Sequence, residues 1–486
     1  MSALALTADQ QAAAEAFAAW LAGPAEGTPF VLSGYAGTGK TFLSMAFLAQ
    51  AEAAGLCWTV VAPTHKAVGV LRDHLRRAGL APTWYPSTIH RLLRLKLRRQ
   101  GDRERCEETE QTAGALEHLG LVLIDEASMV DSDLLEITLR CAHPFRTRLV
   151  FVGDPAQLPP VAEPRSPVFA LGRSAGSQLT EVVRHQGPVL RLARGIREAI
   201  LPGRPPPPLP PVRTAEGMVA LLNRSDWLRA AQDAMRRSAE TDNPDLARIL
   251  CYTNRSLERL VPIARRALHG AMADQLPVLP GEVLISRSAV MAPACREGED
   301  AAEEPDMVLG SNRELVVRDV TPERCDLADF GLSSADLGGE LAVPVIDTLT
   351  ATVETGETQL TLRLLPALAS PGRAALEAVL ARLRQQARLA GKREGKALWR
   401  RFFLVRDAFA ALGPAAVLTV HRSQGSTFAQ VFVDADVFWP QDPVLRRQLL
   451  YVAVSRASES VALMATPAAR DEARIWADWL QDDAMG

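Results

Sequence analysis

The segment at residues 34–41 constrains this chain more than any other part of its sequence. It reads Gly-Tyr-Ala-Gly-Thr-Gly-Lys-Thr and matches the phosphate-loop pattern Gly-x-x-x-x-Gly-Lys-Ser/Thr. An apolar run at residues 30–33 precedes it and a helical pattern follows it. The glycines let backbone N–H groups close around phosphates, and the N-terminus of the following helix adds a favourable dipole. The pattern therefore predicts a nucleotide site in which Lys40 reaches the β- and γ-phosphates and Thr41 holds Mg²⁺.

Short apolar runs alternate with helical stretches through the first 180 residues. They lie at residues 30–33, 58–62, 121–124 and 149–152. This alternation predicts a parallel sheet built of βαβ units, in which ligands bind at the carboxyl ends of the strands. A second α/β pattern has expected strands at residues 247–252, 416–420, 430–434 and 460–465. The predicted fold class is therefore α/β, with two such domains.

Three segments interrupt the α/β pattern. Residues 92–99 and 103–110 flank the turn Gln100-Gly101-Asp102, which predicts a small inserted hairpin. Residues 280 to about 370 are turn-broken and rich in Thr, Val and Leu, which indicates a small β domain within the second α/β domain. A helix is expected to follow at roughly 371–389. The proline-rich run at 201–212 predicts a polyproline II surface connection.

Two further strand ends carry candidate catalytic side chains. The apolar run at 121–124 ends in Asp125 and Glu126. Asp125 fits a second Mg²⁺ anchor, directly or through water, and Glu126 fits the base that activates the attacking water. After the run at 149–152, Gln157 is a candidate contact to the γ-phosphate.

Eight motifs occur in a characteristic order: AGTGKT, APTHKA, STIH, IDEAS, GDPAQLPP, LTEVVR, TVHRSQGST and LLYVAVSRA. On these motifs the chain resembles superfamily 1B DNA helicases, most closely the Dda-like helicases of phages and bacteria, with RecD-like proteins more distant. The resemblance runs from Leu6 to about Leu463. It implies two RecA-like domains with ATP between them, and movement 5′ to 3′ on single-stranded DNA driven by ATP hydrolysis.

The resemblance also implies a domain organisation. RecA-like domain 1A would comprise residues 1–86 and 114–176, with a pin hairpin, domain 1B, at 87–113. RecA-like domain 2A would comprise residues 177–278 and 407–486, with an SH3-like tower, domain 2B, inserted at 279–406. The expected pin has basic residues but no aromatic side chain, which leaves its efficiency as a wedge in doubt. Aromatic residues near the end of the tower are expected to fix it by packing: Trp399, Phe402, Phe403 and Phe409.

Residue by residue, the resemblance implies a nucleotide site. Gln10 would read adenine, and Arg184 and Arg456 would be arginine fingers from the second domain. The expected nucleotide-binding residues are Gln10, Gly37, Thr38, Gly39, Lys40, Thr41, Asp125 and Gly425, with Thr41 and Asp125 on the metal. The expected catalytic residues are Lys40, Glu126, Gln157, Arg184 and Arg456.

The resemblance implies a DNA track on other loops. Hydroxyl, imidazole and amide groups suit contacts to phosphates without reading sequence. The expected DNA contacts are Thr64, His65, Lys66, Ser87, Thr88, His90, Thr253, Asn254, Thr419, His421, Ser423 and Gln424. Trp84, Tyr85 and Trp439 are candidates either for stacking on bases or for packing in the core.

Charge and composition limit how the chain can bind a polyanion and in which compartment it is expected. The net charge is −3, from 54 basic and 57 acidic side chains, so a polyanion would need a local basic groove. The six cysteines show no metal-ligand spacing, which is typical of thiols in a reducing compartment. No signal peptide and no run of 18 apolar residues is recognisable. The expectation is a cytoplasmic monomer in a bacterial cell or a phage-infected host.

The expected partners are single-stranded and fork DNA, with single-strand binding protein or replication and repair proteins as further candidates. The sequence is compatible with two alternative functions. The chain could be a single-strand translocase that displaces proteins and unwinds poorly, or a motor subunit that is active only within a larger DNA repair complex. RNA in place of DNA is a further possible track, which a contact to the 2′-hydroxyl would decide.

Overall fold

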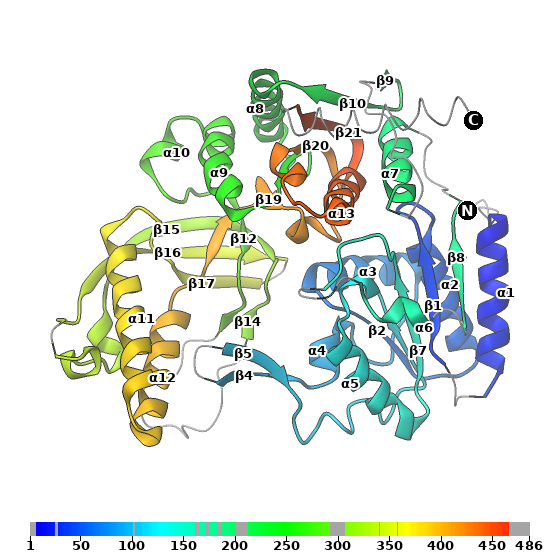
Figure 1. Ribbon diagram of the computed structural model, residues 1–486, viewed down its shortest axis with the longest axis horizontal. Helices are drawn as coiled ribbons and strands as arrows, with labels where there is room; N and C mark the ends of the chain where they lie inside the picture. Colours follow the sequence, from blue (N-terminus) through cyan, green and yellow to red (C-terminus); the bar gives the residue numbers. More distant parts are fainter. Residues whose placement is uncertain are drawn as a thin grey trace. The chain divides into compact units, whose positions relative to one another are not determined.

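The structure is a computed structural model that describes residues 6–24, 28–100, 103–160, 163, 165–171, 175–181, 187–200, 212–291, 307–339, 341–356 and 358–465. The chain divides into two compact units. The first comprises Met1–Lys96, Cys106–Leu268 and Ala416–Gly486, and the second comprises Leu97–Arg105 and His269–Ala415. Figure 1 shows the elements of both units coloured along the sequence.

The first unit begins with a parallel sheet in the order β3-β2-β6-β7-β1-β8. Its strands are β1 (Phe30–Gly34), β2 (Trp58–Ala62), β3 (Ser87–Thr88), β6 (Leu121–Ile124), β7 (Arg148–Gly153) and β8 (Gly176–Leu179). The helices that accompany it are α1 (Ala8–Ala22), α2 (Lys40–Ala53), α3 (His65–Ala78), α4 (Ile89–Leu92), α5 (Ser132–Ala142) and α6 (Val168–Leu171), with 3-10 turns η1 (Ala127–Met129) and η2 (His143–Phe145). The strands predicted at 58–62 and 121–124 have the predicted bounds.

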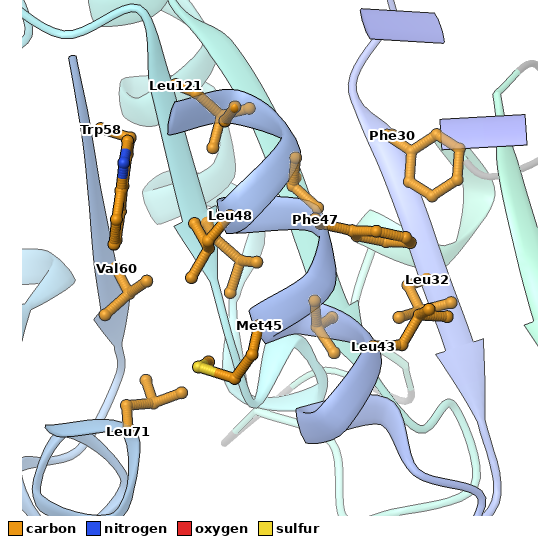
Figure 2. Close-up of a cluster of buried hydrophobic side chains, with 14 of the residues drawn as sticks. Phe30, Leu32, Leu43, Met45, Phe47, Leu48, Trp58, Val60, Leu71 and Leu121 are labelled. Carbon is orange, nitrogen blue, oxygen red and sulfur yellow. The ribbon is translucent and has the colours of Figure 1, made fainter. Parts of the chain in front are cut away.

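Apolar side chains cover both faces of this sheet, because consecutive residues of a strand point to opposite faces. On one face, Phe47 of α2 points toward Phe30 and Leu32 of β1, while Leu48 faces the side of β2 (Figure 2). The rings of Phe17 and Phe47 stack with centroids 4.0 Å apart. Each fully buried large side chain stabilises the fold by roughly 1.5–3 kcal/mol. This packing holds β1 and α2 rigidly on either side of the loop between them.

A second sheet in the same unit has the order β19-β11-β20-β21-β10-β9. Its strands are β9 (Val212–Thr214), β10 (Gly217–Leu222), β11 (Ala247–Cys251), β19 (Val417–Thr419), β20 (Phe428–Val433) and β21 (Ala457–Met464). All pairs are parallel except β9 with β10. The helices are α7 (Pro188–Glu198), α8 (Arg224–Glu240), α9 (Asn254–His269) and α13 (Pro443–Ser455), with 3-10 turns η5 (His421–Ser423) and η6 (Ala435–Phe438). The predicted second α/β pattern is confirmed.

The second unit is built on an antiparallel sheet in the order β17-β16-β15-β12-β18. Its strands are β12 (Val283–Ser286), β15 (Glu314–Asp326), β16 (Val345–Thr355), β17 (Thr358–Leu364) and β18 (Leu412–Pro414), beside the short pair β13 (Val290–Met291) and β14 (Met307–Leu309). The helical segments are α10 (Met272–Gln275), α11 (Pro371–Leu389), α12 (Lys392–Asp407), η3 (Leu327–Phe330) and η4 (Ser334–Leu337). The predicted small β domain is thus observed, and α11 has the predicted bounds.

Aromatic packing holds the helices of the second unit together, as expected. Trp399 and Phe402 meet edge to face with centroids 5.4 Å apart, and Phe402 meets Phe403 in the same way at 5.2 Å. Phe409 lies in the same buried cluster. These side chains fix α12 against α11 and the sheet, with Phe402, Phe403 and Phe409 buried and Trp399 partly buried.

The inserted hairpin is shorter than predicted. Its strands are β4 (Lys96–Gln100) and β5 (Arg103–Glu107), and they pair in a sheet of their own. The predicted first arm at 92–99 was wrong at its start, because Leu92 and Leu93 are buried in the core of the first unit. The chain is therefore still part of the core at these two leucines, and the first strand of the hairpin begins only at Lys96.

Two predicted domain boundaries also differ from the structure. The first sheet was expected to end at residue 176, but β8 at 176–179 pairs with β1. The insertion was expected at 279–406, whereas the second unit runs from His269 to Ala415 because β18 pairs with β12. The proline run at 201–211 and the acidic stretch at 297–306 lie outside the described residues.

Within the described ranges, no helix is long and apolar enough to cross a membrane. The five cysteines placed there, Cys57, Cys106, Cys141, Cys251 and Cys325, are free thiols.

Candidate functional site

The phosphate loop joins β1 to α2. Its backbone turns through Gly37 and Gly39, which have φ angles of 80° and 83° and so occupy a region that favours glycine. Gly39 caps α2, whose first residue is Lys40. The loop therefore directs the N-terminus of a 14-residue helix at the space beyond β1, where an anion is stabilised.

Lys40 folds back onto its own loop. Its Nζ donates to the carbonyl oxygens of Gly34 and Tyr35, at 3.0 and 2.8 Å. Burial lowers the pKa of Lys40, while the nearby carboxylates of Asp154 and Glu126 oppose that shift. The ammonium group is thus held at the loop that would surround a phosphate.

Gln10 reaches the phosphate loop from α1. Its Oε1 accepts a hydrogen bond from Thr7 N at 3.2 Å, and its Nε2 donates to the carbonyl oxygen of Thr38 at 2.9 Å. A Cβ on Gly39 would lie 2.5 Å from that Nε2, so a larger residue there would displace the Gln10 amide from the loop. The expected reading of adenine by Gln10 stays a prediction, and the structure adds a second role in supporting the loop.

Asp125 and Glu126 follow β6 directly. Asp125 accepts a hydrogen bond from Glu126 N at 2.8 Å, and Glu126 has a φ angle of 52°, which is uncommon for a residue with a side chain. Burial and the Glu126 charge raise the pKa of Asp125 to about 7. A cation between these acids and the phosphate loop would relieve this repulsion.

The residues present fit a Mg²⁺–nucleotide complex. Thr41 is the second residue of α2, partly exposed beside Lys40. Across the described part of the chain, no group of three or more His, Cys, Asp or Glu side chains could hold a metal by itself. Mg²⁺ usually keeps several waters and binds through one or two protein ligands plus substrate phosphates, so Thr41 and Asp125 suffice.

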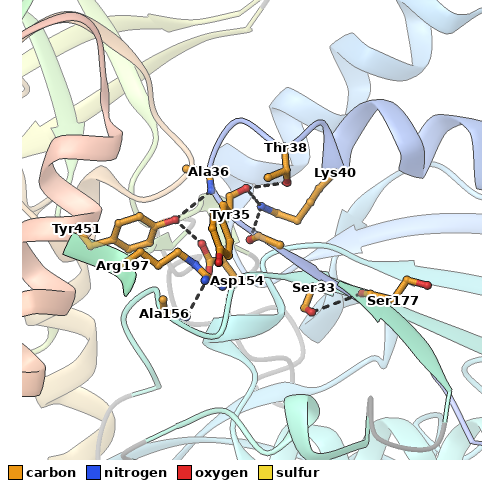
Figure 3. A network of polar contacts seen from close by, with 11 residues as sticks. Ser33, Tyr35, Ala36, Thr38, Lys40, Asp154, Ala156, Ser177, Arg197 and Tyr451 are labelled. Carbon is orange, nitrogen blue, oxygen red and sulfur yellow. Dashed lines mark hydrogen bonds and ion pairs between the residues drawn. The ribbon is translucent and has the colours of Figure 1, made fainter. Parts of the chain in front are cut away.

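A buried polar network joins the phosphate loop to the second sheet (Figure 3). Tyr451 of α13 donates a hydrogen bond to Asp154 Oδ2 and accepts one from Ala36 N at 3.0 Å. Arg197 of α7 donates to Asp154 Oδ1 at 3.1 Å, and its guanidinium lies 3.6 Å from the centroid of the Tyr35 ring. Asp154, Arg197 and Tyr451 are all at most 4% exposed. Two elements of the second sheet's domain therefore meet the loop of the first.

Sequence reasoning missed this network. Asp154 and Tyr451 stand inside motifs that had been recognised, GDPAQLPP and LLYVAVSRA, but no role was given to them. Arg197 lies in no recognised motif. The partner of a buried polar side chain 297 residues away cannot be found from local patterns.

Arg456 ends α13 next to this network. It is 7% exposed, and its guanidinium donates to the carbonyl oxygens of Val452 and Ser426, both at 3.2 Å. Burial lowers the pKa of Arg456, and Glu126 is the strongest opposing charge. Ser426, which Arg456 contacts, follows Gly425, and a Cβ on Gly425 would lie 3.9 Å from Glu126 Oε1, so this expected arginine finger contacts the loop that borders the expected base. The other expected finger, Arg184, lies outside the described residues.

Polar atoms without hydrogen-bond partners gather in this region. They include Gln157 Oε1, Gln424 Nε2 and Ser426 Oγ, all buried. Leaving such groups unpaired costs about 1–3 kcal/mol each. A Cβ on Gly425 would lie 3.9 Å from Glu126 Oε1, so the loop after η5 also borders the acids. Unpaired buried groups beside a phosphate loop fit a polar ligand.

We expect Tyr451→Phe to lower the free energy of unfolding by about 1–3 kcal/mol, because the Asp154 carboxylate and the Ala36 N–H each lose a buried partner. Urea titration measures this loss, and the KM for ATP should rise with it. Tyr85→Phe removes a hydroxyl from an exposed ring and is the matched control. Unchanged stability and KM in Tyr451→Phe would show that the network does not support the loop.

The expected DNA contacts of the first sheet follow its outer strands. Thr64 caps α3 after β2, and His65 and Lys66 begin that helix. Ser87 and Thr88 form β3, and His90 follows in α4. β3 and β2 are the two strands at one edge of the sheet, away from the phosphate loop after β1. Burial lowers the pKa of His90, so it would contact DNA as a neutral imidazole.

The expected contacts of the second sheet follow β11 and β19, again the two strands at one edge. Asn254 and His421 are exposed there, and Thr419 is largely buried at the end of β19. Thr253 is partly committed elsewhere, since its hydroxyl donates to Asp436 Oδ2 at 2.9 Å.

Two expected contacts are not presented by this structure. Ser423 is fully buried, and its hydroxyl donates to the carbonyl oxygen of Val420 at 2.8 Å. Gln424 is also buried, with its Nε2 unpaired, and lies beside Gly425 at the acids. The loop therefore turns these two side chains inward.

Two family models match the chain. A model described as an AAA domain matches residues 5–200, and a model described as a UvrD-like helicase C-terminal domain matches residues 414–464. The first covers the sheet with the phosphate loop, and the second covers β19, β20, α13 and β21 of the second sheet.

The chain is also similar to individual proteins. It is 24% identical over 450 residues to the ATP-dependent DNA helicase dda of Enterobacteria phage T4, covering 88% of this chain and 93% of the relative. It is 36% identical over 169 residues to the ATP-dependent RecD2 DNA helicase of Deinococcus radiodurans, covering 34% of this chain and 21% of that protein. The solved structure of a Pif1 helicase from Bacteroides, in complex with ADP-AlF3 and ssDNA, aligns over 98% of each chain with 15% identity and a TM-score of 0.45.

The phage helicase matches over almost the full length of both chains. The two family models fall on the two parallel-sheet domains that meet at the phosphate loop. On this agreement, the chain is similar to ATP-dependent DNA helicases over most of its length.

Proposed function

We propose that this chain hydrolyses ATP between its two RecA-like sheets and uses the energy to move 5′ to 3′ along single-stranded DNA and to unwind duplex DNA. The observation that carries this proposal is the meeting of the phosphate loop with α13 of the second sheet, where Tyr451 binds both Ala36 and Asp154. A nucleotide at this loop would be in contact with both sheets. Its hydrolysis can therefore change how they pack, which is the requirement for a motor.

The proposed catalytic roles come from the motifs, and the contacts around the phosphate loop support them. Lys40 and the backbone of the loop bind the phosphates, and Glu126 accepts the proton of the attacking water. Arg456 and Gln157 face the transferred phosphate, and Arg184 is proposed as a second finger from its motif. Thr41 and Asp125 would hold Mg²⁺, which when bound offsets charge on the phosphates.

The proposed DNA track runs along one end of each sheet. Contacts after β2 and β3 would hold one part of the strand, and contacts after β11 and β19 would hold another. Asn254 and His421 are exposed on the second sheet, and hydroxyl, amide and imidazole groups bind phosphates of any sequence. Alternating opening and closing of the two sheets would then advance the strand.

We further propose that β4 and β5 form the pin and that the sheet of the second unit is an SH3-like tower. The pin segment at residues 92–110 contains no Phe, Trp or Tyr. This absence favours a second candidate function, a single-strand translocase that displaces proteins and separates strands poorly. A fork-unwinding assay beside a protein-displacement assay distinguishes the two. For either function we propose a cytoplasmic monomer.

The first test is ATP hydrolysis with and without single-stranded DNA, followed by unwinding of duplexes that carry only a 5′ or only a 3′ tail. We expect hydrolysis to be stimulated by DNA and unwinding to start from the 5′ tail alone. The affinity for DNA should fall steeply as salt rises, because contacts to phosphates release counterions. Unwinding from the 3′ tail alone would contradict the polarity, and no stimulation by any strand would contradict the track.

A further inference from the structure

A cavity of about 470 Å³ lies at the outer edge of the first sheet. Arg72 of α3 lines it on one side, and the segment that leads into β3 contributes Trp84 and Tyr85. Arg91 of α4 and Arg94 after it complete the wall. Its volume is in the range of roughly 300–1,000 Å³ that is typical of small-ligand sites.

The cavity combines positive charge with an exposed aromatic ring. Three of its lining residues are arginines, and none is acidic. Tyr85 is 74% exposed, an unusual position for so large a ring in a folded domain. Trp84 is partly buried and packs against the core of the sheet, so it forms a fixed wall. Such a combination suits a flat, electron-rich ring that is attached to an anion.

Tyr85 is held in place by Arg72. The guanidinium carbon lies 4.3 Å from the centroid of the Tyr85 ring, and Nη2 donates to the carbonyl oxygen of Pro86 at 2.6 Å. Arg72 Nε is buried without a hydrogen-bond partner. The Arg72 guanidinium therefore covers one face of the Tyr85 ring, and the solvent-exposed part of the ring is the remainder. A ring fixed in this way loses little freedom when a second ring stacks on it.

The cavity adjoins the proposed DNA track. Ser87 is one of the expected DNA contacts and also lines the cavity. β3 is the outermost strand of its sheet, so a strand of DNA that crosses from β2 to β3 leaves the sheet at this edge. The cavity is the next surface that it would meet.

We propose that this cavity binds one nucleotide of single-stranded DNA as the strand leaves the first sheet. The base stacks on the exposed face of Tyr85, and the attached phosphate lies against Arg91 and Arg94. The proposal rests on the proposed function, since it adds a base contact to a track otherwise made of phosphate contacts. Any base could stack, so the contact would add grip without sequence preference.

Photo-cross-linking tests the contact directly. Single 5-iodouracil substitutions are moved along an oligo(dT) strand, the complex with the full chain is irradiated, and the cross-linked peptide is identified. We expect one strand position to react with Tyr85 or Trp84. If wild-type protein binds the strand but no position reacts with either side chain, the proposal is overturned.

Equilibrium binding provides the second test. We expect Tyr85→Ala to weaken oligo(dT) binding about tenfold and Tyr85→Phe, which keeps the ring, to retain it. Arg91→Ala should reduce the slope of log affinity against log salt by about one. Arg76→Ala is the matched control, because Arg76 lies on the same helix as Arg72 but is exposed and paired with Asp73. Wild-type affinity in Tyr85→Ala would overturn the proposal.

The two proposals fail in different ways. If wild-type protein neither binds oligo(dT) nor hydrolyses more ATP in its presence, the proposed function itself fails. If wild-type protein binds and Tyr85→Ala binds equally well, only the base contact fails. Binding of free dTMP that Tyr85→Ala abolishes, without a cross-link to the strand, would assign the cavity to a mononucleotide and overturn the proposal. ATP hydrolysis without DNA should be unchanged in Tyr85→Ala, because the ring lies away from the phosphate loop.

Discussion

Lys40→Ala is expected to reduce ATP hydrolysis by at least about 10²–10³-fold, measured as phosphate release with saturating single-stranded DNA. The reason is local. Lys40 is the cation at the N-terminus of α2, where two carbonyl oxygens of the loop already hold its ammonium group. Alanine leaves the phosphates without the charge that offsets their own, and no other lysine stands in the loop.

Controls separate this effect from misfolding. Lys396→Ala removes an exposed lysine from α12 and should leave hydrolysis unchanged. Lys40→Ala should also bind single-stranded DNA normally without nucleotide, because Lys40 lies away from the strand ends proposed for the track. Normal turnover in Lys40→Ala would refute the assignment of the nucleotide site.

Glu126→Gln is expected to bind ATP and to hydrolyse it about 10²–10⁴-fold more slowly. Glutamine keeps the size of the side chain and the backbone turn at this position, but it cannot accept a proton from water. It also removes the Glu126 charge, which adds to the effect of burial in raising the pKa of Asp125, so binding of the Mg²⁺ complex should be retained or strengthened. Single-turnover hydrolysis, together with binding of a fluorescent ATP analogue, measures both effects.

The matched control for Glu126→Gln is Glu117→Gln, an exposed glutamate in the same unit. It should behave as wild type in both measurements. If Glu126→Gln binds nucleotide tightly and still turns over at the wild-type rate, another group is the base. Gln157 would not be that base, because an amide does not accept a proton from water. Its buried, unpaired Oε1 would be the first group to examine for positioning the water.

Much of the fold could be predicted because the signals are local. Strands such as β2 and β6 are continuous apolar runs bounded by loop residues, and α11 has a proline at its first position. The errors occurred where pairing or burial over long distances decided the outcome. β8 joins the first sheet by pairing with β1, and the second unit extends to residue 415 because β18 pairs with β12.

The candidate site likewise contains residues that local sequence patterns identify and residues that only long-range packing brings together. The sequence by itself determined the phosphate loop and the acids after β6, because strand, loop and helix are neighbours and their residue types admit few structures. Only the tertiary structure decided which distant groups meet. It joined Asp154 to Tyr451 and Arg197, turned Ser423 inward, and left Tyr85 exposed against Arg72. These contacts depend on how separate segments pack, and hydrogen-bonded or stacked pairs between them leave no periodic pattern along the chain.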